Sequence, residues 1–488
     1  MNTTSLSRTL ALALAAMAAG CTTVGPDFQR PDPLPVQRYT AEPLTLESAT
    51  AQDATSDIPR QLLASGEAPV PDWWELFHSD AFDSIVRRAL ANNRTLSAAA
   101  ASLAQAQELA NAQAGTLAPQ VGLAASAGRQ KLGAATLGDF SLPPFTYFSV
   151  GPTVSYKLDY TGGGRRSVEQ QQALAQYRQQ QLEAARLAVT GNALAQALRI
   201  ASLRAQIATV ESLLERDRQN LKLVQLAFDA GSVARLDIIS AQAQLAGDQT
   251  QLPPLRQQLS VARHALAILT GSAPATAALP EPDLAQITLP TELPLSVPSE
   301  LARRRPDILA AEAQLHASTA AVGVAEGNLY PHIDLTASAG AQAGVFGHLF
   351  DHSSGVFGLA AGLVAPLFDG GTLRAEKRAA VDAMHASAAN YEQTVLEAFG
   401  QVADSLYALE HGAEDLQAHA SAQDAARDDV ELTRQSYQEG NVGVLQVLDA
   451  ERRYQQARLG YVRAQGQRYI DTVQLLLALG GAGPGTQR

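Results

Sequence analysis

The second half of the chain repeats the first half at an offset of roughly 210 residues, far longer than the ~20–50 residues of solenoid repeats. The segment GTLAPQVGLAASAG at 115–128 corresponds to GNLYPHIDLTASAG at 327–340. Farther along, Gly231 corresponds to Gly440, and several of the positions that follow these glycines match as well. Each repeat is therefore a large substructure with several secondary-structure elements, and the fold must accommodate it twice.

Two segments in each repeat alternate polar and apolar residues, as strands with one polar and one apolar face do. The alternation is clearest at 331–340 and 147–158, and weaker at 119–128 and 356–365. Each segment has about ten residues, the length that a tilted transmembrane strand needs. A strand at the edge of a soluble β-sandwich is the alternative that this pattern leaves open.

A long helix is predicted after the second strand of each repeat. Apolar residues recur at spacings of three and four over 164–230 and again over 372–439, the period of a coiled coil. At about 1.5 Å per residue, a helix of this length spans roughly 100 Å. Shorter helices are predicted to return at 233–270 and 442–479, although Pro253-Pro254 should kink the first of them.

Composition excludes several classes of function. Aromatic residues make up only 5% of the chain, and long tracts of alanine and glutamine favour extended helices over compact cores. The formal net charge of −12 argues against nucleic acid as a partner, because nucleic-acid binding needs a basic face.

No catalytic motif is recognisable, so neither an enzyme nor a cofactor is predicted. His348 and His352 have a spacing that could bind a metal ion, but a solvated loop is favoured and no metal site is predicted.

The start of the chain has the pattern of a bacterial export signal. Residues 1–20 contain Arg8 and then an apolar run that is too short to span a membrane. The following Cys21 is the only cysteine, and the sequence AAGC looks like a lipobox, so Cys21 is the predicted lipid attachment site. Thr22 is not the aspartate that retains such lipoproteins at the inner membrane, which indicates the outer membrane. An ordinary signal peptide beside a chance cysteine is the alternative.

The expected organisation follows from the repeat. After the signal peptide, residues 21–79 are predicted to be a lipidated N-terminal tether and belt, rich in Pro, Thr and Ala. Repeat 1 at 80–298 contains a helix, two β-barrel strands, a long helical hairpin and a belt segment. Repeat 2 at 299–488 contains the same helix, strands and hairpin and then the C-terminus. The fold class is α+β, with an internal two-fold sequence repeat.

Four strands per chain are too few to enclose a lumen, since about eight strands leave room only for side chains. Several chains must therefore contribute, and a cyclic trimer would supply twelve strands. The long helices would form a second, helical barrel, and the assembly would be a tube that conducts solutes. A non-conducting structural outer-membrane lipoprotein, with coiled coils as a spacer, is a different class of function that stays open.

Three segments carry a resemblance to a known family: RRPDILAAEAQL at 304–315, DWWELFHSDAFDSIVRRALANN at 72–93, and GNVGVLQVLDAERRYQQA at 440–457. Together with the repeated strand motif, they resemble the outer membrane factor (TolC-like) family, in particular the lipoprotein branch that serves tripartite drug efflux pumps. The resemblance covers nearly the whole chain. It implies a trimeric membrane protein with a 12-strand transmembrane β-barrel, a long coiled-coil α-helical barrel and a mixed equatorial belt.

The resemblance also implies a function and a set of partners. The chain would be an exit duct in the outer membrane, lipid-anchored at its N-terminus and projecting into the periplasm, that passively conducts drugs or other small molecules. The implied partners are two further copies in a homotrimer, a periplasmic adaptor (membrane fusion) protein, an inner-membrane pump of the resistance-nodulation-division type, and outer-membrane lipid. The outlet of a type I protein secretion system or of a metal export system is the alternative within transport.

Members of this family close their periplasmic end with contacts that include Asp and Arg near the second tip, and the resemblance carries these roles to Asp449 and Arg452. Under threefold symmetry Asp449 would form an anionic ring, and Arg452, one turn away, could tie neighbouring coils. An ordinary exposed ion pair, worth about 0.3–0.5 kcal/mol, is the alternative. Gln446 stands where a relative has a second Asp, which argues against a double acidic ring. Asp237, at the first tip, is a further gate candidate.

The turns between the long helices and the return helices are the expected contacts for the adaptor. They comprise Gly231, Ser232 and Val233 in the first repeat, and Gly440, Asn441 and Val442 in the second. Their glycines are expected to end the long helices and to reverse the chain.

Overall fold

The computed structural model describes residues 23–42, 61–67, 72–131 and 143–481. The predicted signal peptide and Cys21 lie outside the described residues. The chain divides into two compact units, each of which draws on both repeats. The strand unit comprises Met1–Pro31, Ser102–Gln179 and Ala310–Glu392, and the coil unit comprises Asp32–Ala101, Gln180–Leu309 and Gln393–Arg488. Within the described residues, no helix is both long enough and apolar enough to cross a membrane.

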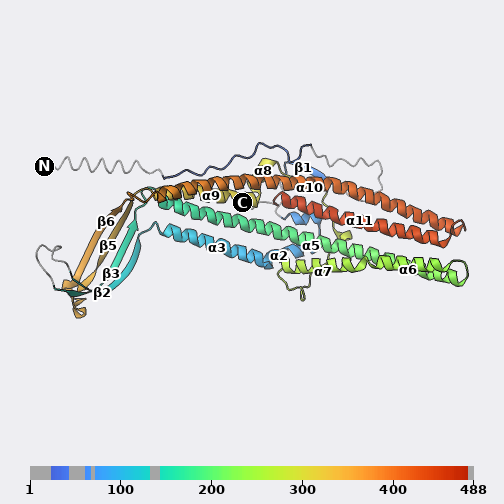
Figure 1. The fold of residues 1–488 in the computed structure, drawn as a ribbon, viewed down its shortest axis with the longest axis horizontal. Helices are drawn as coiled ribbons and strands as arrows, with labels where there is room; N and C mark the ends of the chain where they lie inside the picture. The colour runs from blue at the N-terminus through green and yellow to red at the C-terminus, as the bar shows by residue number, and fades with distance from the viewer. Residues whose placement is uncertain (1–22, 43–60, 68–71, 132–142, 482–488) are drawn as a thin grey trace. The chain divides into compact units, whose positions relative to one another are not determined.

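The strand unit contains a four-stranded antiparallel sheet in the order β2-β3-β5-β6 (Figure 1). Each repeat contributes one hairpin, and β3 of the first repeat pairs with β5 of the second. The strands are β2 (Gln120–Gln130), β3 (Phe145–Lys157), β5 (His332–Ala343) and β6 (Gly355–Val364). They confirm the four predicted segments, with ends that differ by one to three residues.

The two repeats meet at glycines in the centre of this sheet. Pro152 has no N–H to donate, and the pairing of β3 with β5 is interrupted there. Gly151 lies against Gly340, and a Cβ added to Gly151 would stand 2.0 Å from the carbonyl oxygen of Ala339. Only glycine permits so close an approach of the two backbones.

One long helix follows each hairpin, and the two helices have the same length. They are α5 (Gly163–Asp229) and α10 (Thr372–Gln438), each of 67 residues. Asp159 accepts hydrogen bonds at 2.9 Å from two backbone N–H groups at the start of α5, and Asp369 does the same at 2.8 Å for α10. These carboxylates cap N–H groups that have no partner inside the helix. The predicted long helices are confirmed to within one residue.

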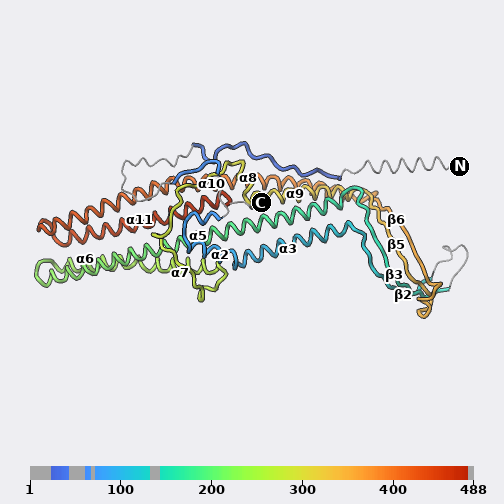
Figure 2. Tube along the Cα trace, turned by 180° about the vertical axis from the view of Figure 1, so that it is seen from behind, coloured from blue at the N-terminus to red at the C-terminus, as the bar shows by residue number. Residues whose placement is uncertain are grey.

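The coil unit is built on the apolar seams of these helices. In both views α6 (Arg235–Gln249) runs beside α5, and α11 (Val444–Ala478) runs beside α10 (Figures 1 and 2). Residues at coiled-coil spacings are buried, among them Leu194, Leu198, Leu203, Val210 and Leu214 of α5, and Val395, Val402, Leu406, Leu409 and Leu416 of α10. The predicted coiled-coil period is therefore confirmed.

The first return helix is not the continuous helix predicted over 233–270. It is divided into α6 and α7 (Leu252–Leu269), whereas the second return helix, α11, is unbroken. Pro253 and Pro254 lie in the first turn of α7, where the missing N–H groups would have no intrahelical partner. The expected kink is thus a break between two helices, placed just before the prolines.

Two other predicted helices are also divided. The helix predicted at the start of repeat 1 is α2 (Asp80–Asn92) followed by α3 (Arg94–Gly115). Between them, the Oδ1 of Asn93 accepts hydrogen bonds from two backbone N–H groups in the first turn of α3. The helix predicted at the start of repeat 2 is α8 (Pro298–Arg304) followed by α9 (Pro306–Gly327).

Arg305 stands at the break between α8 and α9, because a residue before proline avoids helical geometry. Its buried guanidinium donates hydrogen bonds to the carbonyl of Ala478, at the end of α11, at 2.9 Å and to Asp307 at 2.8 Å. The RRPD sequence therefore has a structural role: it joins the start of α9 to the end of the last helix.

Part of the predicted tether and belt is a short strand. Residues Leu62–Ser65 form β1, which pairs in parallel with β4 (Glu292–Leu295) of the predicted belt. The neighbouring Gln61 amide donates to the carbonyl of Pro290 at 2.9 Å and to the hydroxyl of Thr472 on α11 at 3.1 Å. A four-residue strand has no periodicity of its own, so its partner, distant in sequence, determines its conformation.

Candidate gate at the helical tips

Both helical hairpins turn through the same backbone motif. The N–H of Gly231 bonds the carbonyl three residues back at 2.8 Å, and the N–H of Ser232 bonds the carbonyl five residues back at 2.9 Å. Gly440 and Asn441 make the same pair of bonds at 3.0 and 2.9 Å. The two glycines have φ of 76° and 79°, a region that other residues adopt only under strain. These are Schellman motifs, and they end both long helices at equivalent positions.

The tip residues differ in exposure. Gly231, Ser232, Gly440 and Asn441 are exposed, and Val233 and Val442 are half-buried. Val233 packs against a small apolar cluster of Val224, Ile238 and Ala241, which holds the first turn onto its helices. Large apolar side chains nearby remain exposed in the single chain: Leu226, Leu236, Ile239, Leu432 and Tyr437. The tips thus combine a rigid backbone with accessible apolar surface.

Asp237, the gate candidate of the first tip, forms a hydrogen bond within its own helix start. Its Oδ2 accepts a hydrogen bond at 2.8 Å from the backbone N–H of Ala234, the residue before α6. A carboxylate in the first turn of a helix satisfies an unpaired N–H and favours the positive end of the helix dipole. The aspartate therefore holds the start of α6. At the corresponding turn of α11 the sequence has Gln446 instead.

Asp449 and Arg452, the gate candidates of the second tip, are in direct contact. A guanidinium nitrogen of Arg452 lies 2.8 Å from Oδ1 of Asp449, and one of Arg453 lies 2.6 Å from Oδ2. Arg453 also contacts Asp429 of α10 at 2.8 Å. The hydrogen bond to Asp429 and the charge of Asp449 raise the pKa of Arg453. The aspartate thus joins two arginines, one of which ties α11 to α10.

A second ion network joins α11 to both long helices. The carboxylate of Glu451 lies 2.5 Å from a guanidinium nitrogen of Arg434 on α10 and 4.0 Å from one of Arg216 on α5. Glu451 is largely buried, with 12% of its side chain exposed, whereas both arginines are about half exposed. This carboxylate links the two coils within one chain, beside the predicted gate pair.

Asp217, which follows Arg216 in α5, is a buried acidic residue. Asp217 of α5 and Asp248 of α6 are only 5% and 4% exposed, and their side chains are within hydrogen-bonding reach of each other. Burial, together with the neighbouring charge of Asp248, raises the pKa of Asp217 from 3.8 to about 6, and the charge of Arg452 opposes this rise. The Gln251 amide donates to Asp248 at 2.8 Å. The pair lies close to the break between α6 and α7.

Sequence reasoning brought together Asp449 and Arg452 but missed the partners around them. Arg453 is adjacent in the sequence LDAERR, and its spacing of four from Asp449 was a sufficient signal. Asp429 pairs with Arg453, and Glu451 pairs with Arg434, only because of the register of α10 against α11. Nor could helical periodicity pair Asp217 with Asp248, because the two lie in different helices.

The chain matches a known family over most of its length. The sequence profile of outer membrane efflux proteins matches residues 85–272 and 297–481, one stretch in each repeat. The chain belongs to the outer membrane efflux protein family. The match includes both tips, the candidate gate and all four strands of the sheet.

Individual relatives of this efflux protein agree with that assignment. The pyoverdine export outer membrane protein OpmQ of Pseudomonas aeruginosa is 31% identical over 430 residues, which cover 86% of this chain and 90% of OpmQ. The probable efflux pump outer membrane protein TtgC of Pseudomonas putida is 27% identical over 478 residues, or 97% of this chain and 95% of TtgC. The protein is an outer-membrane efflux channel, and its place in the cell is the outer membrane.

Solved channels have the same fold. The outer-membrane channel OprN superposes with a TM-score of 0.82 at 28% identity, over 94% of this chain and 99% of OprN. The open state of the Neisseria gonorrhoeae MtrE outer membrane channel superposes with a TM-score of 0.80 at 25% identity, over 94% of this chain and 98% of MtrE. The Campylobacter jejuni CmeC channel, at 19% identity and a TM-score of 0.83, shares the fold over 96% of both chains.

Proposed function

We propose that this efflux protein is the exit duct of a tripartite pump. In this proposal a homotrimer receives small molecules from an inner-membrane pump of the resistance-nodulation-division type through a periplasmic adaptor, and conducts them passively to the outside. Relatives named for pyoverdine export and toluene efflux carry small organic molecules, and we infer the same class of cargo here. The duct catalyses no reaction and supplies no energy, which the pump provides.

One observation carries the proposal: each chain supplies an open sheet and two equal long helices. Strands β2 and β6 each lack a partner on one side within the described chain, and most side chains of the sheet are exposed. An open edge is a liability unless another strand covers it, and closure into a barrel removes it. Three copies joined edge to edge would form a twelve-strand transmembrane barrel, with the helices continuing it as an α-helical barrel.

The gate and the docking surface belong to this proposal. Asp449 and Arg452 would close the periplasmic end in the resting trimer, and Asp237 would contribute by holding the first tip in shape. The exposed residues of the two turns, Gly231 to Val233 and Gly440 to Val442, would meet the adaptor. Support comes from their position at the ends of the coils and from the rigid turns that present them.

The chain organisation and the anchor are part of the same proposal. Residues 1–20 would be removed as a signal peptide, and Cys21 would carry the lipid. Residues 21–79 would form the tether and belt, and residues 80–298 and 299–488 the two repeats. The pairing of β1 with β4 supports a belt that joins the tether to repeat 1.

Electron microscopy of the detergent-extracted protein, averaged without imposed symmetry, tests the assembly. We expect a hollow rod with threefold symmetry, longer than the roughly 100 Å of the long helices. Planar-bilayer recordings of the same sample test the duct itself. Solid particles without conductance would contradict the proposal and favour the spacer function.

A further inference from the structure

The coil unit contains a hollow of about 580 Å³ that residues of α5, α10 and α11 line. Among the lining residues Val430 and Gln455 are buried, and the side chain of Glu451 is 12% exposed. We call the site the arginine hollow after three exposed lining residues: Arg216 of α5, and Arg427 and Arg434 of α10. Pockets of this size bind small molecules, so the hollow is a candidate binding site.

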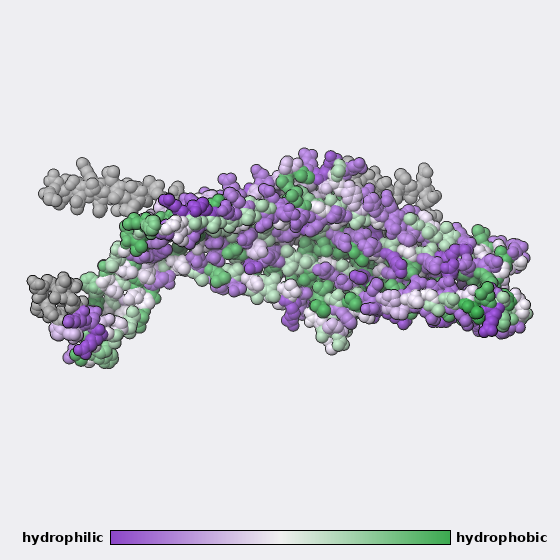
Figure 3. All heavy atoms as spheres, in the orientation of Figure 1, coloured by the Kyte–Doolittle hydropathy of each residue, from purple (hydrophilic) through white to green (hydrophobic). Residues whose placement is uncertain are grey.

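The lining of the arginine hollow has an excess of positive charge in an acidic chain. Three arginines against two glutamates, Glu431 and Glu451, leave a formal charge of +1, whereas the whole chain has −12. Hydrophilic side chains gather over α10 and α11 on the face that Figure 3 shows. A concave surface with an excess of one charge attracts ligands of the opposite charge, so the hollow favours an anion.

Glu451 uses only part of the binding capacity of these arginines. Its carboxylate lies 2.5 Å from a guanidinium nitrogen of Arg434, but 4.0 Å from that of Arg216. Arg427 pairs with aspartates of its own helix, the nearer of which lies at 3.1 Å. Each guanidinium has five N–H donors, so all three arginines can donate to a further acceptor.

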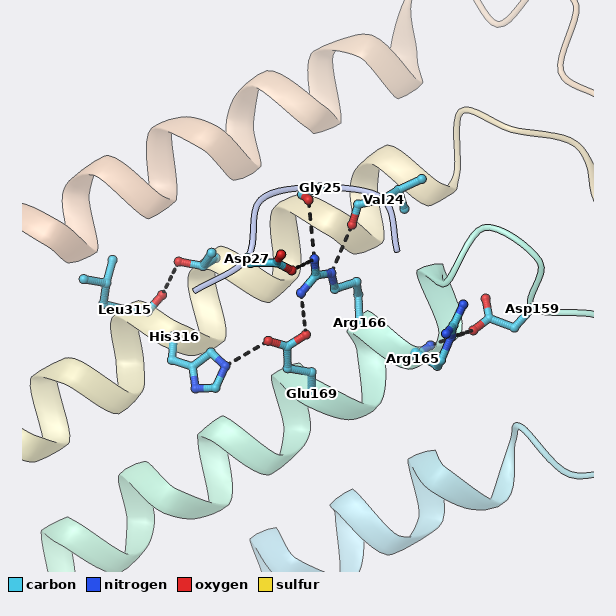
Figure 4. Close-up of polar contacts among 10 residues, drawn as sticks. Val24, Gly25, Asp27, Asp159, Arg165, Arg166, Glu169, Leu315 and His316 are labelled. Carbon is cyan, nitrogen blue, oxygen red and sulfur yellow. Dashed lines mark hydrogen bonds and ion pairs between the residues drawn. The ribbon is translucent and has the colours of Figure 1, made fainter. Parts of the chain in front are cut away.

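Arg166 of α5, in the strand unit, shows the contrasting case of a guanidinium that its own chain saturates (Figure 4). It donates to the carbonyl of Val24 at 3.0 Å and binds Asp27 at 2.5 Å and Glu169 at 2.8 Å. Its side chain is only 5% exposed. The three arginine side chains of the hollow are 45–57% exposed, and their remaining N–H groups are accessible to a ligand.

Gln455 adds a buried polar group to the arginine hollow. The residue is 6% exposed, and among the described residues its Oε1 has no hydrogen-bond partner. Rotation about the last bond of the side chain exchanges this oxygen with the NH₂ group, which can donate to an anion. A buried polar group without a partner costs free energy, and a ligand that bonds the amide recovers it.

We propose that the arginine hollow binds a small organic anion, whose carboxylate or phosphate group the arginines hold. The planar fork of guanidinium matches both groups, because it can donate two parallel hydrogen bonds to their oxygens. The buried Val430 and the half-buried ring of Tyr454 give an apolar body a surface to contact. A bound anion would join α5 to α10 through Arg216 and Arg427. The inference does not rest on the proposed duct.

Isothermal titration calorimetry of the full-length, detergent-extracted protein at low ionic strength tests the site. The probes are benzoate, phenyl phosphate and benzamide, the uncharged counterpart of benzoate. We expect the anions to bind at one site per chain, with an affinity that falls as salt is added, because salt screens exposed charges. The tighter of the two anions identifies the preferred group. Binding of benzamide as tight as that of benzoate, or no binding of either anion, would overturn the proposal.

Substitutions locate the bound anion. R216M and R427M should each weaken binding roughly tenfold, because each removes a charged donor. R218M is the matched control, since Arg218 is 55% exposed on the same helix as Arg216 and does not line the hollow. E451Q should tighten binding several-fold, because it removes a carboxylate that competes for the arginines, and misfolding cannot produce a gain in affinity. Affinities equal to that of the parent protein in R216M, R427M and E451Q would overturn the site.

Discussion

Asp217 is a buried carboxyl group in the contact between α5 and α6, and its pKa is raised. Its carboxyl is buried beside that of Asp248, and among the described residues its Oδ2 has no hydrogen-bond partner. Ionising both of two neighbouring carboxyl groups costs free energy because the charges repel. The pair therefore retains one proton at pH values at which an isolated aspartate is already ionised. Between the same two helices, Val224 packs against Ile238 and Ala241, and a buried charge between α5 and α6 weakens their association.

The pKa of about 6 for Asp217, raised from 3.8, predicts a pH dependence of stability. A raised carboxyl pKa means that the folded chain binds the proton more tightly than the unfolded chain. The contribution of Asp217 to the free energy of unfolding is therefore highest below about pH 4 and falls as the pH rises toward 6. We expect D217N to gain about 1–2 kcal/mol at pH 7.5 and nothing at pH 4. Urea unfolding followed by circular dichroism measures this.

The control is D404N, an aspartate-to-asparagine change at an exposed position of α10. It should leave the pH profile unchanged. A loss of stability in D217N at pH 7.5 would show that the attraction between Asp217 and Arg452 outweighs the cost of burial, and would contradict the prediction.

Asp449 of the proposed gate forms ion pairs with both Arg452 and Arg453. We expect D449A/R452A to raise the resting conductance of the trimer several-fold, because it removes the carboxylate that joins both arginines. Single-channel recording in planar bilayers gives the measurement, and D404A serves as the matched control. R453A should have a smaller effect of the same sign, through its loss of contact with Asp429. Unchanged conductance in D449A/R452A would remove both residues from the gate.

At the scale of elements, periodic segments were predictable and junctions were not. The ends of α5 and α10 follow from heptad spacing and a terminal glycine, signals that are local. The breaks at Asn93 and Arg305 depend on single capping or proline-adjacent residues inside otherwise helical sequence. The short strand β1 exists only through its pairing with β4, which no local pattern records.

Glycines at two positions of the second hairpin should respond to alanine in opposite directions. Gly440 has φ of 79°, which alanine adopts only with strain, so G440A should lower stability by about 1 kcal/mol. Gly400 lies within α10 with open space around its Cα, so G400A should raise stability by about 0.5–1 kcal/mol. Chemical unfolding of the two variants compares them directly. A destabilising G400A would mean that another surface packs there.

At the scale of the whole molecule, the repeat was the signal that allowed the fold to be predicted. It required each half to supply a hairpin of strands and a hairpin of helices, and each half does. The sequence could not predict the ion pair of Arg453 with Asp429 or that of Arg166 with Asp27. These contacts depend on packing between segments that are far apart in the chain, such as Asp27 and α5.

Two attachments to the membrane are expected to act independently in this protein. C21S should abolish incorporation of radiolabelled fatty acid, because Cys21 is the only cysteine and the proposed acyl acceptor. The variant should still fractionate with the outer membrane, since the sheet, once closed in the trimer, holds the protein there without the lipid. Persistent labelling of C21S would place the lipid on another residue. Release of unlabelled C21S into the periplasm would instead show that the sheet inserts only when the anchor delivers it.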